Sequence, residues 1–347
     1  MLQAKMIDKF KFVLEDIDIP KPGPNEVLIK IKYAGICGSD RIMLKGESFF
    51  YAPIVMGHEL SGTVSSKSKN FNIGERVSIF PLVYCRYCEF CKKGDYNLCE
   101  KLAFIGDRDF NGGFAEYVTA DEDNLFLIPD NINNEESILI EPTAVAYHAV
   151  KLTDPEKYKK VMIFGAGIIG LLSLKILKNK FNIKDITVID IHKNRLDVAL
   201  KNGASKVVNL NENNWKDKIK YKETLGDNPF QSGEYDAVLD FVSTSMSTNI
   251  IISSLKKKGK LISVGLPKGG ITITELMFSA ISANELCIRG SYCYDKKDFK
   301  DAISMISDKV VVVSDLVSAI FSLKDVSRAF KEWEANYNDW FKVLLEP

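Results

Sequence analysis

Short segments in the first part of the chain alternate polar and apolar residues. One of them, Glu26–Lys32, follows a Pro-Gly-Pro turn at Pro22–Pro24. Gly74–Phe80 and Gly112–Val118 show the same alternation. A period of two residues is typical of half-buried β-strands, and Pro-Gly pairs separate such strands with turns. We therefore predict that roughly the first 150 residues are mainly strands and turns.

The pattern changes near residue 151, where short apolar strands begin to alternate with helical segments. The predicted strands are Val161–Phe164, Ile186–Asp190, Ala237–Phe241 and Leu261–Gly265. A helix at Leu171–Lys180 follows the first strand, and the helix after the second places Leu196, Ala199 and Leu200 on one face. Strands that alternate with helices indicate βαβ units and a parallel sheet. This part of the chain is therefore predicted to be a doubly wound α/β domain.

The chain ends with two more helical segments and a strand. The helices are expected at Asp298–Ser307 and around Asp325–Ala335, and the strand at Lys342–Leu345. This last strand can return to the first domain. A length of 347 residues agrees with two domains, since one domain takes roughly 150 residues.

Composition excludes several classes of protein. Hydrophobic residues make up 46% and charged residues 27%, so the chain can build a sizeable core and is neither disordered nor collagen-like. Lys plus Arg and Asp plus Glu both number 46. A balanced charge offers no general attraction to nucleic acid or to an anionic membrane, and we expect neither as a partner.

The N-terminus does not have the pattern of a secretory signal. Acids and bases are scattered among its apolar residues, and no small-residue cleavage site follows. The longest apolar region, Val161–Leu177, contains three glycines, Ser173 and Lys175. It falls short of the roughly 18 to 20 apolar residues that span a bilayer. We therefore expect a soluble, cytoplasmic protein.

Four of the seven cysteines lie close together in the sequence. Cys85, Cys88, Cys91 and Cys99 form a C-x2-C-x2-C-x7-C pattern. Two-residue gaps let thiolates converge on one ion, and four thiolates satisfy the tetrahedral preference of structural zinc without an open position. An iron–sulfur cluster also takes four thiolates, but this spacing departs from the common ferredoxin pattern. Structural zinc is therefore favoured over an iron–sulfur cluster and over four unrelated cysteines.

A glycine-rich loop follows the strand at Val161–Phe164 and opens a helix. Its sequence is Gly165-Ala166-Gly167-Ile168-Ile169-Gly170. The first glycine permits a tight turn, the second a close approach of a pyrophosphate, and the third close packing of the helix on the strand. Asp190 ends the next strand, where a carboxylate accepts hydrogen bonds from the adenosine ribose. The loop and this acid predict a dinucleotide-binding site.

The acid at Asp190 also bears on which dinucleotide binds. A carboxylate there repels a 2′-phosphate, which favours NAD over NADP. Arg195 follows closely, after His192 and Lys193, and could soften that preference. On its own, an arginine at such a position is usually on a solvated helix face. We predict NAD as the cofactor, and both interpretations of Arg195 stay open.

Cys37 and His58 stand apart from these motifs. Cys37-Gly-Ser-Asp40 comes at the end of the strand that begins at Glu26, and Gly57-His-Glu59 follows twenty residues later. Taken singly, a cysteine is usually a small buried hydrophobe and a histidine a satisfied or surface residue. A dehydrogenase, however, needs a Lewis acid at the alcohol, and Cys, His and a carboxylate make a zinc site with an open fourth position.

Taken together and in order, these motifs resemble the zinc-dependent medium-chain dehydrogenase/reductase family. The matching segments are Gly35–Asp40, Gly57–Gly62, the four-cysteine segment, Gly112–Tyr117 and the glycine-rich loop. The resemblance covers nearly the whole chain. It implies a GroES-like, mostly β catalytic domain over residues 1–150, completed by about 291–347, and a Rossmann NAD-binding domain over 151–290. The active site would lie in the cleft between them.

The resemblance also implies roles for individual residues. Cys37 and His58 correspond to ligands of a catalytic zinc, and the adjacent Glu59 to a near ligand that exchanges with water. Glu141 stands where the third ligand is expected. Ser39 matches the hydroxyl that relays the proton of the substrate alcohol towards solvent, and Gly265 would lie beside the cofactor. With the structural site, this implies two zinc ions per chain.

Glu141-Pro142 resembles the sorbitol and polyol dehydrogenase branch of the family. Within it, Phe50–Gly62 and Phe104–Arg108 are most similar to galactitol-1-phosphate 5-dehydrogenases. That similarity implies hydride transfer to NAD from a secondary hydroxyl of a polyol phosphate, with galactitol 1-phosphate giving tagatose 6-phosphate. A phosphate needs a cationic seat. The candidates, each more often a solvated side chain, are Arg41, Lys45, Lys296 and Lys297.

Two other functions stay open. One is a sorbitol, butanediol or threonine dehydrogenase of the same family. The other, of a different class, is a noncatalytic dinucleotide-binding zinc protein that has kept only the fold; it predicts loss of the site residues, and all four are present: Cys37, Ser39, His58 and Glu141. Glu285–Gly290 resembles the family's edge strand that pairs across a two-fold axis, which implies a homodimer or homotetramer.

Overall fold

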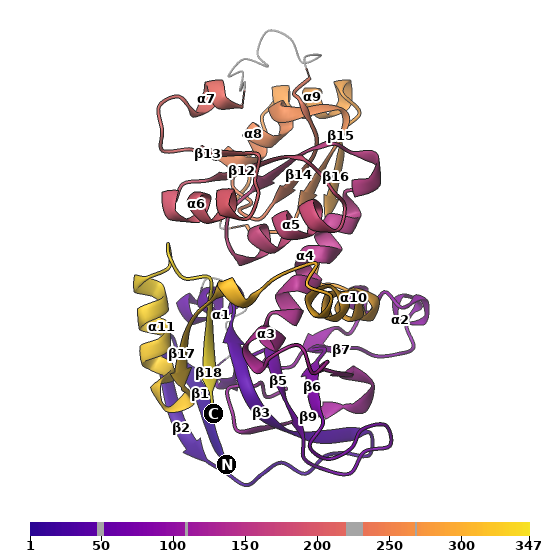
Figure 1. Cartoon of the computed structure of the whole chain (residues 1–347), viewed down its shortest axis with the longest axis vertical. Coiled ribbons are helices and arrows are strands. Elements are labelled where there is room, and N and C mark those ends of the chain that lie inside the picture. Colours follow the sequence, from indigo (N-terminus) through magenta and orange to yellow (C-terminus); the bar gives the residue numbers. More distant parts are fainter. Residues whose placement is uncertain (47–51, 108–109, 220–231, 268) are drawn as a thin grey trace. The chain divides into compact units, whose positions relative to one another are not determined.

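The computed structural model describes residues 1–46, 52–107, 110–219, 232–267 and 269–347. They form two compact units (Figure 1), Met1–Ala144 together with Tyr294–Pro347, and Val145–Cys293. The second unit is thus a continuous segment inserted between two parts of the first. Of the residues that carry the resemblance to galactitol-1-phosphate dehydrogenases, Phe50, Tyr51 and Arg108 lie outside the described residues.

The first unit is built mainly of strands, as the alternating sequence pattern predicts. Its strands are β1 (Leu2–Asp8), β2 (Lys11–Asp16), β3 (Glu26–Ile36), β4 (Ile54–Val55), β5 (Glu59–Val64), β6 (Arg76–Ile79), β7 (Leu82–Val83), β8 (Ala103–Phe104), β9 (Tyr117–Asp121), β10 (Leu125–Leu127), β17 (Val317–Ser322) and β18 (Lys342–Glu346). Its helices are α1 (Gly38–Lys45), α2 (Glu89–Lys93), α3 (Asn134–Ile138), α10 (Lys296–Ser307) and α11 (Val326–Ala335). The helix α4 (Ile140–Leu152) contains the boundary with the second unit.

The largest sheet of this unit has the strand order β10-β6-β5-β3-β18-β17, and β9 also pairs with β3. In β3, Val27, Ile29 and Ile31 are buried and alternate with more exposed residues, so one face of the strand packs on the core. The last strand, β18, pairs antiparallel with β3, with Val343 opposite Ile36. This pairing confirms that the end of the chain returns to the first unit. Smaller sheets have the orders β2-β1-β4 and β7-β8.

The predicted strand at Gly112–Val118 is wrong over most of its length, because β9 begins only at Tyr117. The N–H of Gly112 donates to Val55 O at 2.8 Å, outside the large sheet. A Cβ on Gly112 would come within 2.3 Å of Met56 O. The glycine therefore serves close packing of two chain segments, which alternation of polar and apolar residues does not reveal.

The second unit alternates strands and helices. Its strands are β11 (Lys160–Phe164), β12 (Asp185–Asp190), β13 (Lys206–Asn209), β14 (Tyr235–Asp240), β15 (Leu255–Ser263) and β16 (Cys287–Gly290). Its helices are α5 (Ile168–Asn179), α6 (Lys193–Lys201), α7 (Trp215–Lys218), α8 (Ser245–Ser254) and α9 (Glu275–Ala283). The sheet order is β13-β12-β11-β14-β15-β16, and each neighbouring pair is parallel. This confirms the predicted doubly wound Rossmann sheet, whose strand order reverses between β11 and β14.

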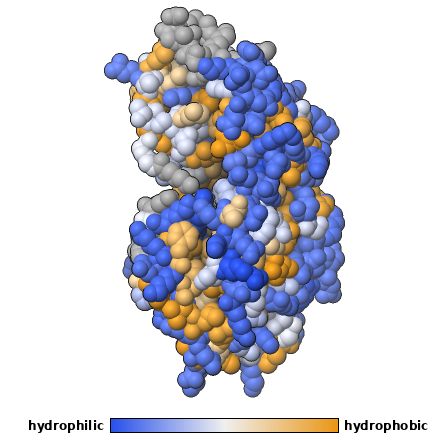
Figure 2. Space-filling model, turned by 90° about the vertical axis from the view of Figure 1, so that its left-hand side faces the viewer, coloured by the Kyte–Doolittle hydropathy of each residue, from blue (hydrophilic) through white to orange (hydrophobic). Residues whose placement is uncertain are grey.

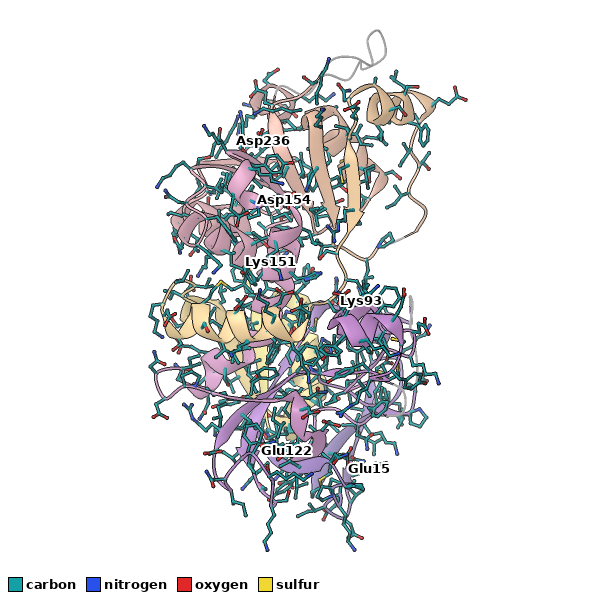
Figure 3. The ribbon with its side chains drawn as sticks, turned by 90° about the vertical axis from the view of Figure 1, so that its right-hand side faces the viewer. Glu15, Lys93, Glu122, Lys151, Asp154 and Asp236 are labelled. Atoms are coloured by element: carbon teal, nitrogen blue, oxygen red, sulfur yellow. The ribbon has the colours of Figure 1, made fainter. Side chains whose placement is uncertain are left out.

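Polar groups tie the beginnings of these parallel strands together. Asp236, labelled in Figure 3, accepts the N–H groups of Lys159 and Lys160 at 2.9 and 2.8 Å. It also accepts a hydrogen bond from Lys256 Nζ at 2.7 Å. Asp236 lies in β14, while Lys160 lies in β11 and Lys256 in β15, so this one carboxylate links β14 to the strands on both of its sides.

The helix α6 differs from its predicted pattern at one position. Leu196 and Ala199 are buried as expected, but Leu200 is 45% exposed. Successive residues are about 100° apart around a helix axis. The buried face of α6 is narrow, and Leu200 lies beyond its edge. The prediction for Leu200 was therefore wrong.

Both hydrophilic and hydrophobic residues reach the surface. In Figure 2, hydrophobic residues gather on the first unit, on the side where Figure 1 places β2 and α11. Val13 and Leu14 of β2 are among the exposed apolar residues.

None of the helices in the described ranges has the length and apolarity that crossing a lipid bilayer requires.

Candidate functional site

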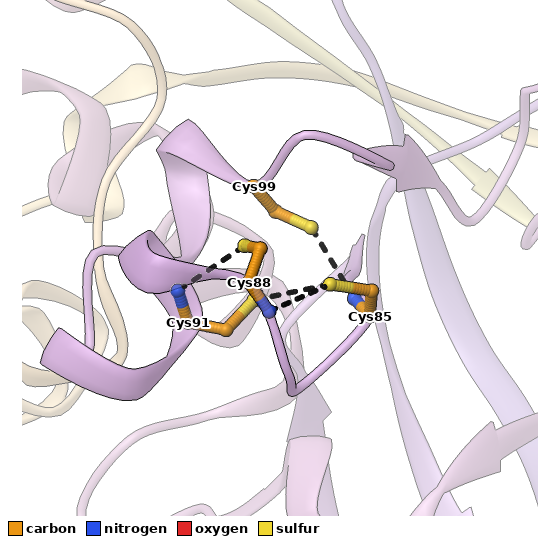
Figure 4. A group of neighbouring side chains, drawn as sticks. All are labelled: Cys85, Cys88, Cys91 and Cys99. Carbon is orange, nitrogen blue, oxygen red and sulfur yellow. Dashed lines mark hydrogen bonds between the residues drawn. The ribbon is translucent and has the colours of Figure 1, made fainter.

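The four clustered cysteines meet in one lobe of the first unit (Figure 4). Their sulfur atoms all lie within 4.8 Å of one another. Cys88 caps the N-terminus of α2, Cys91 lies inside this helix, and Cys99 follows a short 3-10 turn, η1 (Tyr96–Leu98). Tight turns between the cysteines therefore bring four thiols from a single chain segment to one point.

Backbone N–H groups point at these sulfur atoms (dashed lines in Figure 4). Cys85 N–H donates to Cys99 Sγ at 3.2 Å, and Cys88 N–H donates to Cys85 Sγ at 3.4 Å. Hydrogen bonds from the backbone of Cys91 and Glu100 lower the pKa of Cys88 to about 6. Burial raises the pKa of Cys91 to about 12, an effect that a divalent cation would reverse. Four convergent thiols supported in this way fit a zinc ion.

Cys37, His58 and Glu59 form a second group in the same unit. Cys37 follows β3 as the N-cap of α1, and Glu59 begins β5, which pairs antiparallel with β3. This pairing places Glu59 opposite Gly35. As a result, the three candidate ligand atoms lie within 4.8 Å of one another, although twenty residues separate the two motifs.

The charges around His58 favour a bound cation. Burial lowers the pKa of His58, but the neighbouring Cys37 and then Asp40 outweigh this and raise the pKa well above its usual value. Asp40 Oδ1 faces His58 Nδ1 at 3.8 Å, and Asp40 Oδ2 accepts the N–H of Cys37 at 2.8 Å. A carboxylate behind a histidine is a common support of metal-binding imidazoles.

Glu59 is held by a lysine that the sequence analysis missed. Both of its carboxylate oxygens accept hydrogen bonds from Lys342 Nζ, with Oε1 at 2.6 Å, and both side chains are 1% exposed. Lys342 Nζ also donates to Ile36 O at 3.1 Å. Gly35 leaves room for the carboxylate, because a Cβ there would come within 2.3 Å of Glu59 Oε2. Since 283 residues separate the two partners, no local motif indicates this pair.

Glu141 lies in the first turn of α4 and is not part of the group that Cys37, His58 and Glu59 form among the described residues. Its Oε1 accepts the hydroxyl of Tyr294, a second residue that the sequence analysis missed, at 2.7 Å. Burial, and then repulsion from Glu59, raise the pKa of Glu141 to about 7. A nearby cation would stabilise the ionised form.

The glycine-rich loop joins β11 to α5 in the second unit. Gly165 has a φ of +105°, and a Cβ on Gly170 would come within 2.0 Å of Gly165 O, so tight turning and close packing explain these two glycines. Among the described residues, the atom within 4 Å of a Cβ built on Gly167 is Arg195 Nη1, at 3.7 Å. Open space at Gly167, at the N-terminus of a helix, fits the pyrophosphate of a dinucleotide.

Asp190 lies beside this loop at the end of β12 and is largely buried. Its Oδ2 accepts the N–H of Ala166 at 2.7 Å, and its Oδ1 accepts the N–H groups of Ile191 and His192. The carboxylate thus orders the loop, and Oδ2 keeps a lone pair for a ribose hydroxyl. Arg195 is buried and faces the loop, so its interpretation as a solvated helix residue was wrong.

Gly265 follows the end of β15, and its N–H donates to Asp240 O at 3.1 Å. A Cβ there would come within 2.7 Å of the carbonyl carbon of Phe241. Close approach of two strand ends therefore explains this glycine within the unit itself. Its predicted place beside the cofactor stays a prediction.

Comparison with known proteins covers both units. Residues 23–130 match the alcohol dehydrogenase GroES-like domain, and residues 169–308 match the zinc-binding dehydrogenase domain. A probable D-xylulose reductase A of Aspergillus fumigatus is 35% identical over 344 residues, which cover 95% of this chain and 92% of that protein. This chain belongs to the zinc-dependent medium-chain dehydrogenase/reductase family. It is accordingly a zinc-binding, NAD-dependent oxidoreductase of alcohols or polyols.

Solved structures of the family agree with the fold of this dehydrogenase. A galactitol-1-phosphate dehydrogenase from Escherichia coli is 28% identical with a TM-score of 0.89, and the match covers 100% of both chains. An alcohol dehydrogenase from Escherichia coli, complexed with NADH, is 26% identical with a TM-score of 0.90 and covers 100% of this chain and 99% of that chain.

Three of the four candidates for a phosphate seat in this dehydrogenase, Arg41, Lys45 and Lys296, contact other groups of the chain. Arg41 lies in α1, after Cys37. Ser39, the predicted proton relay, lies in the same helix and is half-buried. Arg41 donates two hydrogen bonds to Glu334 of α11, and Lys45 Nζ lies 3.1 Å from the same carboxylate. The bonds from Arg41 and Lys45 lower the pKa of Glu334 to about 2. This pairing offsets one of the two positive charges that a phosphate could use.

Lys296 is also held inside the dehydrogenase. Its Nζ donates to Asp123 O at 2.6 Å and lies 5.1 to 5.8 Å from the ring centres of Phe80, Tyr84 and Tyr96. Burial lowers the pKa of Lys296 to about 8. Lys297, in contrast, is exposed. The interior contacts of Lys296 attach α10 to the lobe that carries the four cysteines.

Proposed function

We propose that this dehydrogenase interconverts a secondary alcohol of a polyol and the corresponding ketose, with NAD as the hydride carrier. The observation that carries the proposal is the grouping of Cys37, His58 and Glu59 in a site that attracts cations. A zinc ion in that site supplies Lewis acidity, which lowers the pKa of a substrate hydroxyl. NAD supplies the acceptor for the hydride.

The residues around the site have separate tasks in this proposal. Cys37, His58 and Glu141 hold the metal and leave a fourth position for the substrate oxygen. Glu59 is the near ligand, which its bonds to Lys342 hold in place beside the other two residues. Ser39, half-exposed in the first turn of α1, takes up the hydroxyl proton and passes it towards solvent.

The cofactor binds the second unit in this proposal. The backbone N–H groups of Ile168 and Ile169, at the N-terminus of α5, face the pyrophosphate across the open space at Gly167. Asp190 accepts a ribose hydroxyl and repels a 2′-phosphate, which supports NAD over NADP. Arg195 lies at the same loop and completes the seat of the pyrophosphate.

Unphosphorylated polyols are the favoured substrate class. Glu334 neutralises one of the two positive charges of Arg41 and Lys45, so a phosphate ester on α1 would meet a net charge of one and would compete with this carboxylate. The fungal relative with 35% identity carries the name of a D-xylulose reductase, which supports xylitol and sorbitol as first substrates. Galactitol 1-phosphate, oxidised to tagatose 6-phosphate, is the second candidate, favoured by the full-length match to galactitol-1-phosphate dehydrogenase.

We also propose that the dehydrogenase is a homo-oligomer. The strand β16 (Cys287–Gly290) is an edge of the parallel sheet, and all of its residues are exposed. Ile288 in this strand is 46% exposed, and an exposed apolar edge favours pairing with a second copy across a two-fold axis. Light scattering after gel filtration tests this, with Ile288→Lys expected to shift the mass towards the monomer.

Formation of NADH from a panel of alcohols tests the proposed substrates. The panel contains xylitol, sorbitol, galactitol, galactitol 1-phosphate and butane-2,3-diol, each with NAD and separately with NADP. Turnover of xylitol or sorbitol with NAD supports the favoured class. Turnover of galactitol 1-phosphate alone establishes the second candidate, and turnover of the diol alone overturns both. Absence of every activity in a protein with bound zinc contradicts the proposed polyol chemistry.

A further inference from the structure

The hydroxyl of Tyr294 contacts Glu141, which is predicted to bind the catalytic zinc but lies outside the group of Cys37, His58 and Glu59. Tyr294 Oη donates to Glu141 Oε1 at 2.7 Å, and the side chains lie in the same unit although 153 residues separate them. Tyr294 is 1% exposed and Glu141 is 8% exposed. Water therefore competes little for this hydrogen bond.

The ring of Tyr294 has little freedom to move. It meets the ring of Phe80 edge to face, with centres 5.6 Å apart, and stacks on Phe299 at 5.9 Å. Such packing fixes the direction in which the hydroxyl points. The backbone of Glu141 belongs to the first turn of α4, and the dipole of this helix stabilises a negative charge on its side chain.

We infer that Tyr294 is a positioning residue that presents Glu141 to the catalytic zinc. The inference rests on the proposed function, in which Glu141 is the third ligand. With Oε1 accepting the hydroxyl, Oε2 keeps both of its lone pairs and is the oxygen that the carboxylate presents to the metal in this inference. A hydrogen bond to an ionised carboxylate is stronger than one between neutral groups, so the contact also favours the form that binds metal. Partners of this kind typically change metal affinity or activity by roughly 10–100-fold.

The chain offers a matched set of variants for the test. Tyr294→Phe removes only the hydroxyl and keeps the ring between Phe80 and Phe299. Tyr235→Phe is the control, because Tyr235 is also buried and donates to Thr187 Oγ1 at 3.1 Å, but in the second unit. Glu141→Ala tests the ligand itself.

The experiment measures zinc release from the full-length, zinc-loaded protein in a chelator, by elemental analysis of samples taken over time. The zinc held by four thiolates serves as the slow internal standard. We expect Tyr294→Phe to release the other zinc about 10–100-fold faster than wild type while it still unfolds in a single urea transition, and we expect zinc release from Tyr235→Phe to match wild type. Cobalt substitution gives a second readout, because the absorption of the catalytic cobalt should shift in Tyr294→Phe alone.

Two outcomes overturn the inference in different ways. If Glu141→Ala loses the catalytic zinc while Tyr294→Phe keeps the rate and cobalt spectrum of wild type, Tyr294 has no positioning role and the proposed function stands. If Glu141→Ala retains both zinc ions with unchanged release, Glu141 is not a ligand. In that case the proposed metal site and the role of Tyr294 fail together.

Discussion

Replacement of Lys342 by methionine is expected to destabilise the first unit more than any change to an exposed ion pair. Lys342 and Glu59 are each 1% exposed, and the ammonium group donates to both carboxylate oxygens and to Ile36 O. Methionine fills a similar volume but leaves the carboxylate of Glu59 buried without its cation. It also leaves the carbonyl of Ile36 without this donor.

The burial of the ion pair sets the expected loss in free energy of unfolding. Removing one partner of a buried ion pair costs about 3–5 kcal/mol, because an uncompensated charge stays in the interior. Lys32→Met is the matched control, since Lys32 pairs with Glu346 of the neighbouring strand β18, but both side chains are 44% exposed. An exposed pair of this kind contributes roughly 0–1 kcal/mol. The two lysine variants should therefore differ by at least about 2 kcal/mol.

Urea unfolding measures both variants. Trp333 and Trp340 lie in the same unit as Lys342 and provide the fluorescence signal. The double variant Glu59→Gln/Lys342→Met removes both charges and should recover most of the lost free energy of unfolding, because it leaves no unpaired charge. A loss below about 1 kcal/mol for Lys342→Met, equal to that of Lys32→Met, would refute the reasoning.

Three further predictions concern the other sites. Gly167→Ala should fold normally, because a Cβ there has open space, and should weaken NADH binding about tenfold or more in a fluorescence titration. Gly170→Ala should instead lower the melting temperature, because its Cβ clashes with Gly165 O. An unchanged NADH affinity in Gly167→Ala would contradict the proposed pyrophosphate seat. Cys88→Ser should lower the zinc content by one ion per chain in elemental analysis, and retention of that ion would exclude the four-thiolate site. The pKa of Glu334 lies at about 2 instead of 4.5, so the stabilisation from its bonds to Arg41 and Lys45 is full above about pH 4.5 and is lost as the pH falls towards 2. Melting curves of Glu334→Gln should therefore show a shallower fall over this interval than wild type, and identical slopes would disprove the linkage.

Much of the fold follows from local patterns in the sequence. The strands of the second unit are short apolar runs, and the glycine-rich loop with Asp190 marks the start of a dinucleotide-binding unit. The last strand also occurs where the pattern places it, and it pairs with β3. These features are local because they depend on backbone propensity and on residues a few positions apart.

The features that sequence analysis missed depend on contacts between distant parts of the chain. Lys342 and Tyr294 reach Glu59 and Glu141 across 283 and 153 residues. Arg195 reads as an exposed helix residue until the loop is placed beside it. In each case a long polar side chain is buried by tertiary packing, which no local pattern encodes. The ion pair of Arg41 is hidden from local patterns for the same reason, since Glu334 reaches Arg41 from the other end of the chain; the phosphate seat itself stays a prediction.

We propose that Cys37 and His58, with Glu141, hold a zinc ion on which polyol oxidation depends. The most direct test measures zinc content and NAD-linked oxidation of xylitol in wild type and in Cys37→Ser, side by side. We predict two zinc ions per chain and turnover for wild type, and one zinc ion with no detectable turnover for Cys37→Ser. Retention of two zinc ions, or of wild-type turnover, by Cys37→Ser would contradict this account.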